Sequence, residues 1–314
     1  MNIATLLLGI FTFVELNCEN LFDCDHDSLK DDTEWTAEGM RHWTKKRYWK
    51  KVNNIGREII ACGEDGEGWA LPDMAVLTEV ENDSVLRDLT KRSLLRNAHY
   101  EYLMTESPDL RGIDVAILYS PMSFCTLRWY PIRVEPRHGM RPTRDILYVS
   151  GIVGSGDTLH VFAVHAPSRF GGEKETRPYR MAVAERLCQA VDSIRSINHE
   201  AQIIVAGDFN DTHSDPALLY CYEHGLQNIA YKARGRHGAE GTYKYQGDWS
   251  SIDNILGSET LAQKVMQYFV ADKPYLLEED KNYGGVKPRR TFYGYTYDGD
   301  GYSDHLPLVL KLRF

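Results

Sequence analysis

The sequence predicts a mixed α/β fold in a single domain that covers residues 1–314. Apolar runs such as 202–206 stop abruptly at polar residues, which is typical of strands buried on both faces. Other segments, such as 177–197, carry apolar residues at helical spacing. No repeat and no Pro/Gly/Ser-rich linker divides the chain, and 314 residues with 43% hydrophobic content are enough to bury one large core.

The first half of the chain alternates between strands and helices. It predicts a strand over 11–16, an acidic loop over 23–42, a helix within 43–62, a strand over 72–77 and a helix over about 83–95. The first helix rests on the spacing of Tyr48, Val52 and Ile55. Its basic residues between Lys45 and Lys51 favour a solvated helix face.

The second half contains more strands than helices. It predicts strands over 112–119, near 124–135 and 145–153, and over 159–164, then a helix over 177–197, a strand over 202–211, a Gly- and Tyr-rich loop over 231–250 and a last strand over 308–314. The strands near 124–135 and 145–153 are expected to form one sheet edge.

The apolar start of the chain, residues 1–11, has two interpretations. It has the apolar character of a secretion signal, but it lacks a basic n-region and a small-residue cleavage site. It is also too short to span a bilayer before Glu15 and Asn17. We therefore expect it to lead into the first strand, with no transmembrane segment and a cytoplasmic location in preference to secretion.

The charge and the cysteines limit the classes of function. A net charge of −9 and a pI near 5.7 disfavour tight, nonspecific binding of duplex nucleic acid. A phosphoester substrate fits this charge, as does brief contact with nucleic acid through a local patch. The six cysteines show no zinc-ligand spacing, so we expect them to be structural and reduced. We expect a monomer.

Polar side chains follow the ends of several buried strands. They are Asn17, Glu79, His165, Asp208 with Asn210, Asp253, and Asp304 with His305. Strand ends of packed sheets gather at one edge, where clefts form. Asp208 and Asn210 are two residues apart and point to the same side of an extended backbone. An ordinary turn would use the same residue types, so this pair alone leaves both interpretations open.

The carboxylates among these residues predict a metal ion. Glu79, Asp208 and Asp304 would repel one another in a partly dry cleft. A divalent cation removes that repulsion. Oxygen ligands without cysteine favour Mg²⁺, with Mn²⁺ as the alternative, over zinc.

The two histidines are candidates for proton chemistry. Asp253 is a candidate to orient the ring of His305, and such a pair activates water or stabilises charge that develops on a phosphate oxygen. Arg111 and Arg169 are candidates to neutralise phosphate oxygens. Each has an ordinary alternative: His165 as a satisfied structural residue, and Arg169 as part of a surface loop.

Seven short blocks occur in one order between residues 17 and 307. They are NCENLFD at 17–23, LTEV at 77–80, RGIDVA at 111–116, HAPSR at 165–169, GDFN at 207–210, IDNI at 252–255 and SDHLP at 303–307. In this order they resemble the endonuclease/exonuclease/phosphatase superfamily. That superfamily includes deoxyribonuclease, abasic-site endonucleases, inositol phosphatases and sphingomyelinases. One such block is weak evidence, whereas seven in order are specific.

The resemblance implies a four-layer α/β sandwich, in which two mixed β-sheets pack face to face with helices outside. It implies that Glu79 binds the metal and that Asn17 and Asp304 complete that end of the site. Asp208 would position or deprotonate the attacking water. Asn210 would hold a phosphate oxygen.

The remaining residues follow from the same resemblance. His305, paired with Asp253, would stabilise the phosphorane-like transition state or act as the base. His165 matches a histidine of the deoxyribonuclease-like and sphingomyelinase-like branches, and Arg111 is a looser match to a phosphate contact. Asn254 departs from the family pattern, in which histidine or tyrosine is commoner at that position.

The function implied is that of a magnesium-dependent hydrolase that cleaves a phosphodiester by direct attack of an activated water, with nuclease activity expected first. One alternative is a phosphatase or phospholipase-type esterase on a small or lipid phosphoester, which the acidic net charge favours. Another is a catalytically idle binding protein on the same fold. Segments 24–41, 231–249 and 282–302 are expected to rim the cleft and set the substrate.

Overall fold

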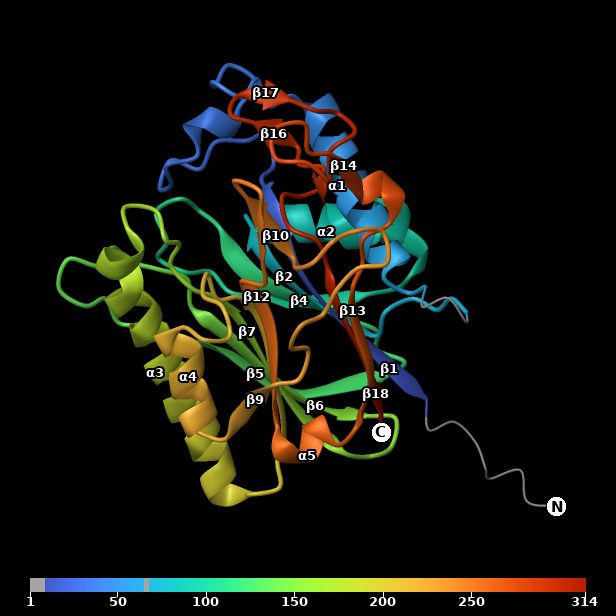
Figure 1. Cartoon of the computed structure of the whole chain (residues 1–314), viewed down its shortest axis with the longest axis vertical. Helices are drawn as coiled ribbons and strands as arrows, with labels where there is room; N and C mark the ends of the chain where they lie inside the picture. Colours follow the sequence, from blue (N-terminus) through green and yellow to red (C-terminus); the bar gives the residue numbers. More distant parts are fainter. Residues whose placement is uncertain (1–8, 65–67) are drawn as a thin grey trace.

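A computed structural model describes residues 9–64 and 68–314, in which the long strands form two six-stranded sheets (Figure 1). Most of the apolar start, residues 1–8, lies outside the described residues. The first sheet has the strand order β13-β18-β1-β2-β4-β3. Its strands are β1 (Ile10–Leu21), β2 (Met74–Val80), β3 (Glu101–Met104), β4 (Asp114–Tyr119), β13 (Val265–Val270) and β18 (Leu308–Arg313). The sheet is mixed, because β1 and β2 are parallel and the other neighbours are antiparallel.

The second sheet has the order β5-β6-β7-β8-β12-β9. Its strands are β5 (Phe124–Ile132), β6 (Ile146–Val153), β7 (Thr158–His165), β8 (Gln202–Asp208), β9 (Leu226–Asn228) and β12 (Asp253–Ser258). This sheet is also mixed, since β7 and β8 run parallel. The predicted sheet edge is present: β5 lies at the edge and pairs with β6.

Helices cover the outer faces of both sheets. They are α1 (Lys45–Ala61), α2 (Asp83–Lys91), α3 (Glu173–Ile197) and α4 (Pro216–Glu223). The short α5 (Glu259–Ala262) lies at one end of the sandwich, and 3₁₀ turns occur at Thr33–Trp35, Leu94–Asn97 and Pro274–Leu276. Helix α2 begins at the side chain of Asn82, which accepts a hydrogen bond from the backbone N–H of Val85 at 3.0 Å. Helices α3 and α4 lie side by side along one flank in Figure 1.

Three apolar clusters separate these layers. The inner cluster lies between the sheets and includes Phe13, Val76, Val149, Ala163 and Ile204. A second lies between the first sheet and helices α1 and α2, and a third between the second sheet and helices α3 and α4. Helix, sheet, sheet and helix thus follow one another, and the predicted four-layer α/β sandwich is confirmed.

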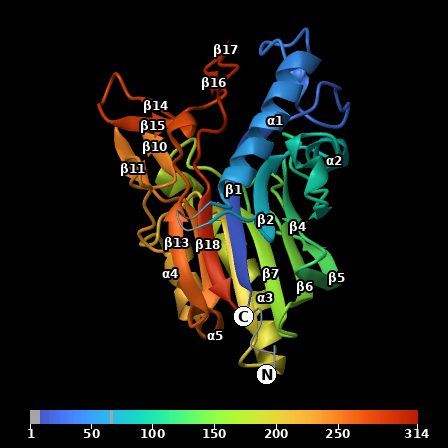
Figure 2. The same cartoon turned by 90° about the vertical axis from the view of Figure 1, so that its right-hand side faces the viewer.

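Short two-stranded ribbons occur in the segments predicted as loops, 231–250 and 282–302, and at residues 277–279, where the sequence predicted no element. They are β10 (Tyr243–Tyr245) with β11 (Asp248–Ser250), β14 (Leu277–Glu279) with β15 (Val286–Pro288), and β16 (Phe292–Tyr293) with β17 (Thr296–Tyr297). Figure 2 shows the first four of these strands grouped at one end of the sandwich. Two residues join β10 to β11 and β16 to β17, whereas residues 280–285 join β14 to β15. Each ribbon has only two strands.

Two local expectations need correction. Strand β1 does not stop near Leu16 but runs to Leu21, with a register shift between Asn17 and Leu21. Lys51 is not on a solvated face: it is only 1% exposed, and its ammonium group contacts a carboxylate oxygen of Glu19 at 3.3 Å. A basic residue can be buried when a carboxylate partners it, which local charge patterning does not reveal. Among the described helices none is long and apolar enough to cross a membrane.

Candidate active site

Strand alternation turns four polar side chains into the space between the sheets. On β8, Ile204 and Ala206 belong to the inner cluster, so Asp208 faces the same way. The same alternation directs Asn17 on β1 and His165 on β7 inward, after inner-cluster residues on the same strands, and Asp253 on β12 inward, two residues before Ile255 of that cluster. All four side chains are buried.

The register places three of these residues side by side. Asp208 on β8 lies opposite His165 on β7 and opposite Asp253 on β12. The sheet therefore brings one imidazole and two carboxylates together across three adjacent strands. Sequence separations of about forty residues between them make this a tertiary feature.

Glu79 reaches the same place through a bulge. Simple alternation after Val76 and Thr78 would turn Glu79 toward the helices. Instead, the backbone of Glu79 has a φ of +60°, and the β2–β4 register shifts between Thr78 and Val80. A carboxylate oxygen of Glu79 then lies 3.9 Å from Nε2 of His165, and the other accepts a hydrogen bond from the backbone N–H of Asn20 at 2.8 Å.

Strained backbone is concentrated here. Glu19, Asn20, Glu79 and Asn210 all have φ between +49° and +60° without being glycine. Such conformations cost of order 1–3 kcal/mol each and cluster at functional sites. The arrangement is held in place by hydrogen bonds, such as the one from the backbone N–H of Glu19 to Oδ1 of Asn17 at 2.9 Å.

Asp208 is the centre of this group. Its Oδ2 accepts a hydrogen bond from Nδ2 of Asn17 at 3.1 Å and lies 3.8 Å from Nε2 of His165, while its Oδ1 accepts from the backbone N–H of Asn210 at 2.7 Å. Burial, together with the negative charge of Asp253, raises the pKa of Asp208 to about 7. A carboxyl group of this kind exchanges a proton near neutral pH.

His305 is bound to Asp253. Nδ1 of His305 lies 2.7 Å from Oδ2 of Asp253, and the hydroxyl of Thr242 donates to the same oxygen. Burial opposes protonation of His305, but the carboxylate of Asp253 outweighs it and raises the pKa of the imidazole well above its usual value. His165 behaves oppositely: burial, followed by the charges of Arg144 and Arg111, lowers its pKa well below the usual value.

Asp304 occupies the outer side of the site. Its carboxylate is paired with the guanidinium of Arg290. Arg290 and His305 outweigh the effect of burial, so the pKa of Asp304 is lowered. The neighbouring Ser303 hydroxyl donates to the backbone carbonyl of Asn17 at 2.6 Å, which ties this segment to β1.

The two arginines predicted to contact phosphate, Arg111 and Arg169, lie in different surroundings. Arg111 is exposed and donates to the side-chain oxygen of Asn20 at 2.7 Å, beside the Glu79 bulge. Arg169 instead pairs with Asp211 at 3.2 Å and Asp215 at 2.6 Å, so it stabilises the turn after β8 rather than facing the site.

The donor set fits a hard divalent cation. The ligand-type atoms of Asp208, Asp253 and His305 lie within 4.8 Å of one another. Because His305 is protonated beside Asp253, the donors left for a cation are the carboxylate oxygens, and Asn17 and Glu79 adjoin Asp208 and His165. Oδ1 of Asp253 is buried with no hydrogen-bond partner among the described residues. Buried oxygens in this number repel one another unless a positive charge is present. Asp304 is joined to Arg290 and is not part of the group of three.

Sequence reasoning missed Glu15. It is fully buried, its carboxylate oxygens have no hydrogen-bond partner among the described residues, and burial raises its pKa well above the usual value, with Asp253 and Asp208 adding to the effect. Its position two residues before Asn17 on one strand was the available signal, because both must face the same side.

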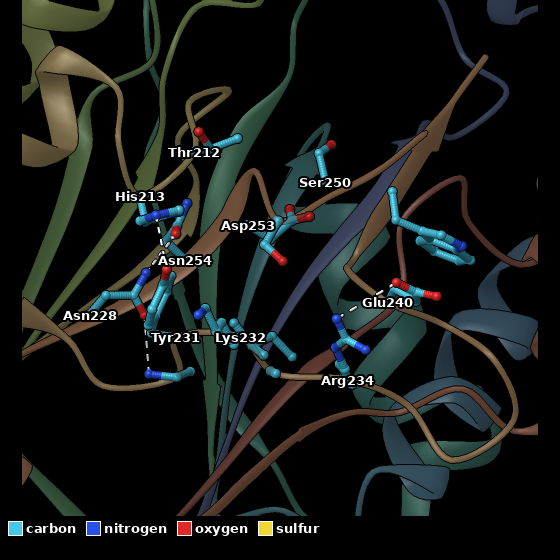
Figure 3. Close-up of a pocket in the computed structure, with 15 residues that line it drawn as sticks. Thr212, His213, Asn228, Tyr231, Lys232, Arg234, Glu240, Ser250, Asp253 and Asn254 are labelled. Carbon is cyan, nitrogen blue, oxygen red and sulfur yellow. Dashed lines mark hydrogen bonds and ion pairs between the residues drawn. The ribbon is translucent and has the colours of Figure 1, made fainter. Parts of the chain in front are cut away.

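A cavity of about 370 Å³ borders the site on the side of β12. Figure 3 shows Asp253 among its lining residues, with Arg234 paired to Glu240. The hydroxyl of Tyr231 contacts Nε2 of His213 at 3.0 Å on the opposite wall. The cavity therefore adjoins the partner of His305.

Comparisons with known proteins agree with this geometry. Residues 12–313 match the model of the endonuclease/exonuclease/phosphatase family. The chain belongs to this family. No curated protein matches it.

Solved structures show the same fold at low identity. An endonuclease/exonuclease/phosphatase family protein from Bacteroides thetaiotaomicron is 15% identical, with a TM-score of 0.61 over 97% of this chain and 98% of that one. A mannosyl-6-phosphatase from the same organism is 16% identical, with a TM-score of 0.64 over 97% and 100% of the two chains. The catalytic domain of human Nocturnin, solved with a bound sulfate, is 16% identical, with a TM-score of 0.58 over 96% and 93%.

Proposed function

We propose that this protein is a divalent-cation-dependent hydrolase that cleaves the P–O bond of a phosphoester by direct attack of water. The observation that carries the proposal is the convergence of Asp208 with the His305–Asp253 pair within 4.8 Å, although the three lie on separate segments. A buried base beside a buried imidazolium is the combination that water activation and charge stabilisation require.

Glu79 and Asn17, with Asp304 on the outer side, are the residues we propose to hold Mg²⁺ or Mn²⁺. Their oxygen donors match the preference of these ions. When bound, the cation would neutralise charge on the phosphate and on the attacking oxygen. Arg290 already neutralises Asp304, so Asp304 would change partner or act through an intervening water.

Asp208 is the proposed acceptor of the proton from the attacking water. Its pKa of about 7 suits a base that works near neutral pH. His305, held as the imidazolium by Asp253, would donate a hydrogen bond to a phosphate oxygen as its charge increases. The amide of Asn210 would hold another phosphate oxygen. Neutral His165 would line the interior of the site, and cationic Arg111 would lie at its exposed edge.

Two substrate classes follow. A phosphodiester in nucleic acid, the first expectation from the sequence, stays a prediction. A specific observation favours a small phosphoester instead: apart from Arg111, cations beside the site are paired with carboxylates, as Lys244 is with Asp280 at 3.0 Å and Lys287 with Glu278 at 3.0 Å. A strand of nucleic acid needs unpaired cations along its path. The mannosyl-6-phosphatase of the same fold is consistent with a small phosphoester.

The test is a comparison of substrates with and without metal. Duplex DNA, RNA, bis-p-nitrophenyl phosphate and sugar phosphates are assayed with Mg²⁺, Mn²⁺ or EDTA. Asp208→Asn and His305→Ala should each lower kcat by at least ~10²-fold, the scale of losing a general base. The matched controls Asp31→Asn and His199→Ala change exposed residues and should leave kcat unchanged.

Two outcomes oppose the proposal. Near-normal rates in either site variant would remove the assigned role. If no phosphoester is hydrolysed with either metal, the proposal of hydrolase activity is wrong. A catalytically idle binding protein on the same fold would then explain the structure better.

A further inference from the structure

A small cavity lined by tyrosines lies beside Asp304. It has a volume of about 200 Å³ and is enclosed by the β10–β11 hairpin, the loop between β14 and β15, and the segment that leads into β16. We call it the tyrosine pocket, lined by Tyr243, Tyr245, Tyr283, Tyr293, Arg290 and Asp304. The segments predicted as loops, 231–250 and 282–302, supply all of its lining residues except Asp280 and Asp304.

The pocket adjoins the proposed site of hydrolysis, because Asp304 lines it and the ring of its Tyr243 lies against His305. Tyr243 forms a β-bridge with His305, and the centres of their two rings are 4.8 Å apart. Arg290, which also lines the pocket, is paired with Asp304. A phosphate held at His305 would therefore place the group esterified to it in the tyrosine pocket.

The walls are held rigidly. The buried Lys244 on β10 donates to the backbone carbonyls of Gly284 at 2.8 Å and Val286 at 3.2 Å, and it pairs with Asp280 at 3.0 Å. Gly247, with a φ of +94°, lets the hairpin turn approach Tyr283, since a β-carbon there would lie 2.9 Å from Cβ of Tyr283. A preformed pocket loses little entropy when it binds a ligand.

The chemistry of the walls selects the ligand. Tyr245 and Tyr283 are 61% and 59% exposed, so their ring faces remain available, and the amides of Gln246 and Asn282 line the same space. Its three cations each face a carboxylate: Lys244 faces Asp280, Lys287 faces Glu278, and Arg290 faces Asp304. The pocket offers ring faces and hydrogen-bonding groups without surplus charge.

We propose that the tyrosine pocket binds a single monosaccharide ring, as the alcohol part of a sugar phosphate ester. A sugar presents C–H faces to aromatic rings and hydroxyl groups to amides, and it carries no charge of its own. A polyanion would find its cations already paired, and a base together with its ribose is larger than a single hexose ring. The link to catalysis rests on the proposed function, whereas binding of the ring does not.

Binding is tested first, without turnover. Saturation-transfer NMR in EDTA measures the methyl α-glycosides of glucose, mannose and galactose against adenosine and uridine. At least one glycoside should bind to the intact chain, and Tyr283→Ala should weaken it roughly tenfold, the scale of one aromatic contact. Tyr268→Ala, which alters an exposed tyrosine on β13 outside the pocket, is the control and should bind normally.

Two results would overturn the sugar assignment. One is binding of the nucleosides with no binding of any glycoside. The other is a Tyr283→Ala variant that binds as tightly as the intact chain, with Tyr245→Ala also unchanged.

Kinetics separate this proposal from the proposed function. With Mg²⁺, release of phosphate from hexose 6-phosphates should exceed that from glycerol 3-phosphate by at least ~10-fold in kcat/KM, and Tyr283→Ala should remove the difference through KM. Equal kcat/KM values for hexose 6-phosphates and glycerol 3-phosphate would refute the preference for a sugar ring. They would leave the proposed phosphoester hydrolysis intact. Sugar binding in EDTA with no hydrolysis of any substrate would refute the hydrolase and keep the pocket.

Discussion

Replacement of Glu58 by glutamine is expected to make folding stability less dependent on pH. Glu58, on α1, is completely buried, and neither carboxylate oxygen has a hydrogen-bond partner among the described residues. Burial raises its pKa from 4.5 to about 8, although the charge of Lys51 acts in the opposite direction. In the folded protein the group is therefore protonated at pH 6, whereas in the unfolded chain it is ionised.

The sign and size follow from proton linkage. Between pH 4.5 and about 8 the folded state binds the proton and the unfolded state does not, so the free energy of unfolding falls as the pH rises. At about 1.4 kcal/mol per pH unit, this interval corresponds to a loss of about 5 kcal/mol. Glutamine resembles the protonated acid in shape and cannot ionise. Glu58→Gln should thus lie within about 1 kcal/mol of the parent protein at pH 5 and exceed its stability by up to about 5 kcal/mol at pH 9.

The assay is urea unfolding followed by tryptophan fluorescence at pH 5, 7 and 9. The difference in unfolding free energy between Glu58→Gln and the parent protein cancels every group that the two share. Glu223→Gln, at an exposed position of α4, is the control and should show no such trend. A difference for Glu58→Gln that is the same at pH 5 and pH 9 would refute the reasoning.

Three further predictions concern capping, packing and catalysis. Asn82→Ala removes the cap of α2 and should cost about 1 kcal/mol in chemical denaturation with phosphoester turnover unchanged, so an unchanged midpoint would argue against the cap. Gly207→Ala would place a β-carbon 1.8 Å from the carbonyl oxygen of Val164. We expect it to lower the free energy of unfolding by more than about 2 kcal/mol, seen as a lower melting temperature. An unchanged melting temperature would contradict the close approach of the two strands. Asp253→Asn should lower kcat by at least ~10²-fold with KM retained, because the imidazolium of His305 loses its partner; full activity would show that the pair is only structural.

The fold could be predicted from the sequence because its signals are local. Apolar runs indicated most of the long strands of both sheets, and helical spacing located α1 and α3. Strand β13 and the short β3 and β9 had no predicted counterpart. The order of the seven blocks predicted the family, which the match over residues 12–313 confirms. The expectation that Asp208 and Asp253 would converge followed from strand ends, and the structure does bring them together. Their roles stay predictions.

The ribbons and buried charges escaped prediction because they depend on distant partners. Lys51 resembles its solvated neighbours in sequence, and only its contact with Glu19 explains its burial. Segment 231–250 contains few apolar residues in alternation, so β10 and β11 were expected as loop. Lys244 joins this hairpin to the loop between β14 and β15, a contact between distant segments.

The sequence by itself determined which residue types lie at the strand ends, and alternation determined that Asn17, Asp208 and Asp253 face one interior. The tertiary structure alone decided that the bulge would turn Glu79 inward and that Arg290 would pair with Asp304. The physical reason is that side-chain direction along a regular strand is set by neighbouring residues. A positive φ or an ion pair between distant segments is set by the packing of the whole chain.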